Sequence, residues 1–185
     1  MMRAWVAAIL ALGLTSPALS AEKLIKASDP EGIVALLEMA GYNPVLDKDQ
    51  FGDPEISFDL DGWETSIAFY GCDEETRKDC ESLQFIGGFD TNGTFSAEEM
   101  IALSGTHRYS QLTLDDEGDV WVRWDVLTGD GISPRLFLQN VRAFSSALDN
   151  AGEAVFVNQG SEDAVVEAAA DAAEAVEEAA EAVSQ

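Results

Sequence analysis

Cys72 and Cys80 are the residues of this chain whose type and spacing best suit covalent chemistry. In an oxidising compartment, two cysteines this close in sequence predict a structural disulfide across a short, charged loop. The spacing differs from the C-x-x-C pattern of redox-active pairs, and the acidic residues between the cysteines disfavour a thiolate. A structural zinc site needs about four ligands, which this pair and the single, distant His107 do not supply.

His107 would also have to serve any Ser-His-Asp hydrolase, because it is the only histidine in the chain. The sequence has no Gly-x-Ser-x-Gly motif that would place a nucleophile. A polar histidine just past a helix is the simpler interpretation. We therefore predict no catalytic residues.

Acidic turns at 47–53, 90–93 and 115–119 raise the question of calcium. The first turn has a glycine at the sixth position of an EF-hand loop, but Phe51 stands at a ligand position and Phe58 where the bidentate glutamate belongs. The second turn has its glycine too early, and the third lies in a tight hairpin that cannot wrap an ion. Tight turns favour Asp, Asn and Gly in any case, so we predict turns and no metal site.

The N-terminal residues indicate the compartment. Arg3 precedes an uncharged apolar run over residues 4–14, and Ala18 and Ser20 occupy the −3 and −1 positions of a cut before Ala21. This layout is typical of a cleaved secretory signal, and the run is too short to span a bilayer. A cut one residue later and a buried N-terminal helix are the alternatives. We expect a periplasmic protein from a Gram-negative bacterium.

Charge and composition restrict the partners. The chain has 35 acidic and 10 basic residues, a formal net charge of −25. Such a surface repels phosphate backbones and anionic lipid headgroups, so we expect no nucleic-acid partner and no membrane binding by the mature form. A phosphate-binding glycine loop is absent from the sequence, and we predict no cofactor.

Periodicity, caps and turn residues predict an α+β fold with element order α-ββββ-α-ββ-α. Hairpin connections dominate, so we expect an antiparallel sheet with the helices packed on one face. Two adjacent glycines, Gly87 and Gly88, predict a bulge or a close backbone approach in the fourth strand. The expected helices are 30–40, 97–104 and one starting at 134, and the expected strands are 42–48, 55–60, 63–70, 82–89, 110–114 and 120–126.

Composition divides the chain into a signal peptide at 1–21, a domain at 22–152 and an acidic, low-complexity tail at 153–185. The tail has no Lys or Arg, and its alanines and valines form only a thin apolar stripe at helical spacing. Small side chains bury little area, and charges of one sign give no attraction between helical turns. We expect the tail to be a solvated helix or disordered, and dispensable for folding.

The blocks FYGC at 69–72 and CESLQFIGGF at 80–89 resemble the secreted, bacterial branch of the YbjN-domain family. Gly41–Tyr42, the Gly-Asp-Pro at 52–54 and the acidic hairpin at 115–119 are similar to that family too, and the resemblance covers about residues 24–148. It implies a fold similar to type III secretion chaperones and a sensory or stress-related regulator that binds proteins. It implies no enzymatic chemistry and carries over no site residues.

Two functional hypotheses follow. The first is a non-enzymatic protein-interaction module, whose partner is a protein, a peptide or an identical subunit. Trp121 and Trp124 have opposite parity on one strand, so one of them should lie on the open face of the sheet, where it could anchor a partner. The second is a small-molecule-binding protein or hydrolase with carboxylates in a helix–sheet cleft, which requires a pocket with convergent carboxylates of raised pKa.

We predict that Cys72 and Cys80 are bonded to each other in the mature protein. Replacing Cys80→Ser should then lower the free energy of unfolding by about 2–3 kcal/mol, because the loop in the unfolded chain is no longer closed. Mass spectrometry under non-reducing conditions tests the bond directly. Alkylation of both thiols without prior reduction would refute it.

Overall fold

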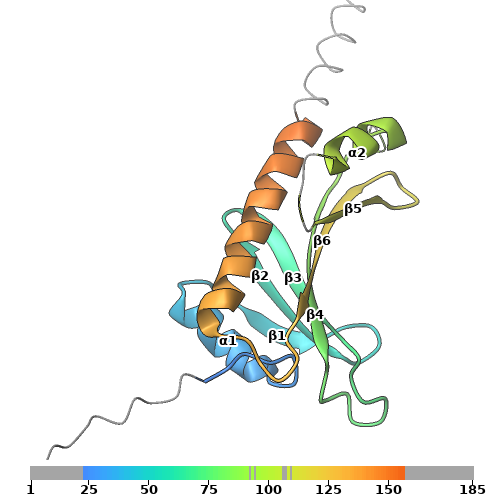
Figure 1. The fold of residues 1–185 in the computed structure, drawn as a ribbon. Helices are drawn as coiled ribbons and strands as arrows, with labels where there is room; N and C mark the ends of the chain where they lie inside the picture. The colour runs from blue at the N-terminus through green and yellow to red at the C-terminus, as the bar shows by residue number, and fades with distance from the viewer. Residues whose placement is uncertain (1–22, 92, 94, 106–107, 109, 157–185) are drawn as a thin grey trace, which may run out of the picture.

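A computed structural model describes residues 23–156, except 92, 94, 106, 107 and 109 (Figure 1). The expected signal sequence, the chain beyond Phe156 and His107 lie outside the described residues. The described chain forms an α+β domain with a six-stranded antiparallel sheet and three helices, in the order that the sequence predicts. None of its helices is long and apolar enough to cross a membrane.

The element bounds agree closely with those expected. The main difference is the late start of the first strand: the Tyr42 amide still donates to the Leu37 carbonyl, so residues 42–44 complete the exit of the first helix. The elements are α1 (Pro30–Met39), β1 (Val45–Lys48), β2 (Pro54–Leu60), β3 (Trp63–Tyr70), β4 (Ser82–Phe89), α2 (Ala97–Ser104), β5 (Gln111–Leu114), β6 (Val120–Leu127) and a helix over residues 134–156, called here the C-terminal helix.

Local chemistry explains where the helices begin. Asp29 caps α1 by accepting a hydrogen bond from the Gly32 amide, and Pro30 occupies the first helical position. Ser96 and Glu99 form a capping box at the start of α2. Ser133 accepts a hydrogen bond from the Leu136 amide at the start of the C-terminal helix.

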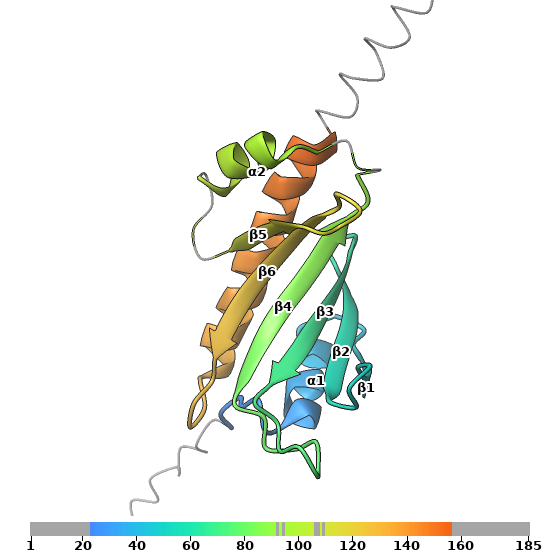
Figure 2. The same ribbon diagram turned by 90° about the vertical axis from the view of Figure 1, so that its right-hand side faces the viewer.

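The strands lie in the order β1-β2-β3-β4-β6-β5, and every neighbouring pair is antiparallel. The turn between β2 and β3 consists of Asp61 and Gly62, both with positive φ (56° and 98°), which is the backbone of a two-residue hairpin turn. Figure 2 shows α1 and the C-terminal helix behind the same face of the sheet. We call the opposite face, which no described element covers, the open face.

Side chains from the sheet and the C-terminal helix fill the space between them. The ring of Phe85 on β4 lies 5.6–5.7 Å from the rings of Phe137 and Phe144, and all three side chains are fully buried. Alternate residues of β2, β3, β4 and β6 point into this core. The apolar alternation in the sequence therefore identifies the buried face correctly.

Gly87 and Gly88 mark a close approach rather than a bulge, since the pairing of β4 with β6 is continuous through both and the pairing with β3 extends to Gly87. A Cβ atom on Gly87 would lie 2.6 Å from Leu148 of the C-terminal helix. A Cβ atom on Gly88 would lie 2.8 Å from the ring of Trp121, on the open face. The lack of a side chain at these two positions of β4 therefore allows close packing on both faces of the sheet.

The C-terminal helix continues beyond Gly152, the last residue of the domain that composition predicts. Val155 is fully buried, and the ring of Phe156 stacks on that of Trp63 at 6.2 Å. A Cβ atom on Gly152 would lie 2.8 Å from Trp63, so this glycine permits close packing. The end of the C-terminal helix therefore packs on the sheet through Val155 and Phe156, although residues 153–156 resemble in composition the acidic segment that follows.

We predict that the chain can be shortened after Val157 but not after Gly152. Removing residues 158–185 should leave the melting temperature within a few degrees, because this segment contains no large apolar side chain besides its valines. Ending at Gly152 also removes Val155, whose burial contributes about 1.5–3 kcal/mol. Thermal unfolding of both truncated proteins beside the full chain is the measurement. Equal melting temperatures for both would contradict the packing of residues 153–156.

Candidate functional site

The two tryptophans of β6 lie on opposite faces of the sheet. Trp124 points into the core, is 7% exposed, and donates from its indole Nε1 to Asn140 Oδ1 on the C-terminal helix at 3.0 Å. Trp121 lies on the open face and is partly exposed. Of the two residues that the sequence suggests for partner binding, only Trp121 is therefore placed where a partner could reach it.

Trp121 is fixed by contacts on several sides. Its indole Nε1 donates to Asp115 Oδ2 at 2.8 Å, and its ring lies over Gly88. The guanidinium carbon of Arg123 is 5.7 Å from the centre of the ring, a cation–π contact. Arg123 in turn donates to the hydroxyl of Thr113 on β5. A side chain held in this way loses little conformational freedom when a partner binds to it.

Asp115 holds both the β5–β6 turn and the tryptophan. Its Oδ1 accepts hydrogen bonds from the amides of Glu117 and Asp119, while Oδ2 accepts from Trp121. The indole N–H, followed by the Asp119 amide, lowers the pKa of the Asp115 carboxyl from its ordinary value of 3.8. The sequence signal for this arrangement is weak, because an aspartate at the start of a hairpin has the same role without a tryptophan nearby.

A shallow depression of about 520 Å³ lies on the open face beside Trp121. Val45 on β1 and Trp121 on β6 form its walls, and Val45 is 61% exposed. Its floor is low because small side chains stand between these walls. We call it the open-face depression; its lining is Asn43, Val45, Ser57, Phe58, Asp59, Glu64, Thr65, Ser66, Ile86 and Trp121.

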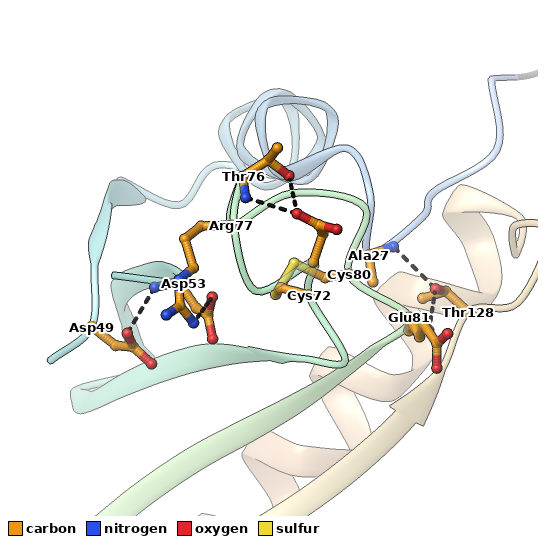
Figure 3. Close-up of a disulfide and its surroundings, with 10 residues drawn as sticks. Ala27, Asp49, Asp53, Cys72, Thr76, Arg77, Cys80, Glu81 and Thr128 are labelled. Carbon is orange, nitrogen blue, oxygen red and sulfur yellow. Dashed lines mark hydrogen bonds and ion pairs between the residues drawn. A yellow bond between two sulfur atoms is a disulfide. The ribbon is translucent and has the colours of Figure 1, made fainter. Parts of the chain in front are cut away.

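Figure 3 shows the cysteine loop at the ends of β3 and β4. The Sγ atoms of Cys72 and Cys80 lie 2.10 Å apart, at disulfide-bonding distance. Within the loop, Asp73 Oδ1 accepts hydrogen bonds from the amide and hydroxyl of Thr76, and these bonds lower the pKa of the Asp73 carboxyl. Arg77 reaches Asp53 at 3.4 Å, which connects the loop to the turn after β1.

The loop also lies beside the N-terminal segment of the domain. The Ala27 amide donates to the hydroxyl of Thr128, which donates to the carbonyl of Glu81 (Figure 3). A pocket of about 380 Å³ lies between the loop, the start of α1 and the turn after β1. Its lining carries three basic and three acidic side chains: Lys48, Arg77, Lys78, Glu31, Asp47 and Asp79. This mixture favours no single charge of ligand.

The acidic turns bind their own backbone. Asp49 Oδ1 accepts hydrogen bonds from the amides of Phe51 and Asp53, as Asp115 does in its hairpin. The turn at 90–93 is described only in part. Within the described residues, no group of three or more His, Cys, Asp or Glu side chains is arranged to hold a metal ion.

The alternative hypothesis of catalytic carboxylates needs them between the helices and the sheet, with raised pKa values. The aromatic rings of the core occupy that space instead. The carboxyl pKa is lowered for Asp29, Asp73 and Asp115. For Asp29 the main cause is the ammonium group of Lys23, 2.7 Å away. A lowered pKa keeps a carboxylate ionised, whereas a general acid must hold its proton.

We predict that Asp115 fixes Trp121 while it is ionised. A lowered folded-state pKa stabilises the fold above the ordinary value of 3.8, and this contribution is lost as the pH falls through the lowered pKa. Tryptophan fluorescence should therefore change below pH 3.8. Asp115→Asn replaces Oδ2 by an amide nitrogen that cannot accept from the indole, so this variant should lack the transition. An unchanged transition in the variant would contradict the assignment.

Comparison with known proteins places the chain in a family. Residues 29–157 match the YbjN family, which is described as "Putative bacterial sensory transduction regulator". No curated protein matches the chain. A crystal structure of an uncharacterized protein from Methanothermobacter thermautotrophicus is 13% identical and has a TM-score of 0.48, covering 68% of this chain and 96% of its own. Because the match to the family spans the sheet and its helices, the chain belongs to the YbjN family.

Proposed function

We propose that this protein is a non-enzymatic interaction module of the periplasm, which binds a protein or peptide on the open face of its sheet. The observation that carries this proposal is the difference between the two faces. Helices cover one face, whereas no described element covers the other. The family's description as a regulator of sensory transduction also favours protein binding.

The open face carries side chains suited to a partner. Val45, Tyr70 and Leu127 are 61%, 47% and 80% exposed, and Trp121 lies on the same face, near the opposite end of β6 from Leu127. Exposed apolar and aromatic side chains on a rigid sheet are typical anchors of protein interfaces. The periplasm is supported by the N-terminal pattern and by the cysteine pair at disulfide-bonding distance.

A second copy of the chain is a less suitable partner than a different protein. Each chain has a formal net charge of −25, so two copies repel each other over the whole surface. A foreign partner of opposite charge gains attraction from the same field. Sensory or stress-related regulation would then act through binding and release of that partner.

We predict that a photo-reactive amino acid at Val45 or Leu127 captures the partner when the full chain is expressed in its native periplasm. Met39, which is 79% exposed on α1 at the covered side, is the matched control and should capture little. The measurement is the set of cross-linked masses. Equal capture from all three positions, or none from the open face, would contradict the proposal, and a doubled mass would identify a second copy as the partner.

A further inference from the structure

We propose that the open-face depression receives a lysine or arginine side chain from a basic segment of the partner protein. This inference rests on the proposed function, because it names the chemistry of a partner bound to the same face. It is carried by a pair of like charges that the hairpin register places at the rim of the depression.

Asp59 on β2 lies directly opposite Glu64 on β3 in the sheet register. Both side chains are exposed on the open face, and they are the only charged residues that line the depression. Like charges directly opposite each other on neighbouring strands repel and destabilise the sheet. The ion pairs of Lys23 with Asp29 and of Arg77 with Asp53 lie elsewhere and do not relieve this repulsion. A cation from a partner would relieve it.

Arg123, the basic residue of β6 on the open face, makes its contacts with residues other than the acidic pair. Arg123 is paired with Ile86 across β4 and β6, but its guanidinium donates to Thr113 and lies against the ring of Trp121. It therefore points towards β5, away from the β2–β3 hairpin that carries Asp59. The described residues that line the depression include no lysine or arginine, so its lining supplies no cation to the acidic pair.

The lining of the depression also fits the stem of a basic side chain. Thr65 pairs with Gly87, so Glu64 lies next to Gly88 on the neighbouring strand. Gly88 has no side chain, and the ring of Trp121 covers it. Across the open face, the carboxylates on β2 and β3 are therefore followed by the indole ring, which lies over β4. The methylene groups of lysine or arginine pack on such a surface while the charged head stays at the acids.

The hollow shape has a simple cause in the register. Ser57 and Ser66 are paired on β2 and β3, between Val45 on one side and Ile86 on the other. Two small side chains between larger ones leave a low floor. An extended segment lying there would place apolar side chains against Val45 and Ile86, and a basic one at Asp59 and Glu64.

The test must separate this site from the general attraction of an acidic protein. The probe is a blocked peptide of three Lys-Val repeats, with three Glu-Val repeats for comparison. The variant Asp59→Asn with Glu64→Gln removes two charges at the depression, and the new carboxamide at position 59 keeps an oxygen that can accept from the Gly62 amide, as the carboxylate does. The matched control, Glu38→Gln with Glu98→Gln, removes two exposed charges from α1 and α2.

We expect the lysine peptide to bind the depression variant about tenfold more weakly than the unaltered full chain, which corresponds to about 1.4 kcal/mol, and the control within about twofold. The depression variant should also melt at a higher temperature, because the cross-strand repulsion is gone. Equal weakening in both variants, or equal binding of the glutamate peptide, would overturn the proposal. Capture of a partner from Val45 and Leu127 would then still support the proposed function.

Discussion

Two neighbouring residues without side chains, Gly87 and Gly88, set the distance between the layers of this protein. They lie on β4, near the middle of the sheet, and point to opposite faces. Leu148 of the C-terminal helix fills the space over Gly87, and the indole of Trp121 fills the space over Gly88. A larger side chain at either position would push away the helix or the tryptophan, because protein cores are packed without spare room. The covered face and the candidate binding face thus depend on one dipeptide.

The charge of the chain limits what the open face can do. Repulsion over the acidic surface disfavours nucleic acids, anionic lipids and further copies of the same chain. Several acids are engaged by the fold itself: Asp29 with Lys23, Asp73 with Thr76, and Asp115 with Trp121. Asp59 also accepts a hydrogen bond from the Gly62 amide, but the register places its carboxylate opposite that of Glu64 across the hairpin. An unrelieved pair of this kind costs stability in the free protein and favours a basic partner.

The cysteine loop lies at the other end of these strands. It connects β3 to β4, contacts the turn after β1 through Arg77 and lies next to the segment before α1. Closing the loop covalently restricts the unfolded chain, and the Arg77–Asp53 pair joins the closed loop to the turn after β1. Holding the loop in this way restricts movement at the ends of β3 and β4, which border the open face. A rigid face binds a partner with a smaller loss of conformational entropy.

The sequence by itself determined the features that depend on neighbouring residues: the helix caps at Asp29 and Ser96, the Asp61–Gly62 turn, and the alternation that separates buried from exposed strand residues. These features follow from backbone geometry within a few residues. The two-residue turn also places Asp59 directly opposite Glu64 in the hairpin. Tertiary structure alone decided which tryptophan lies on the open face and how far the C-terminal helix packs. Trp121 and Trp124 differ only in parity, and the correct choice depends on which face the helices cover. Likewise, Val155 and Phe156 are followed in sequence by the acidic segment, and local composition does not set them apart from it. The burial of Val155 and the stacking of Phe156 on Trp63, which is distant in sequence, make them part of the packed domain.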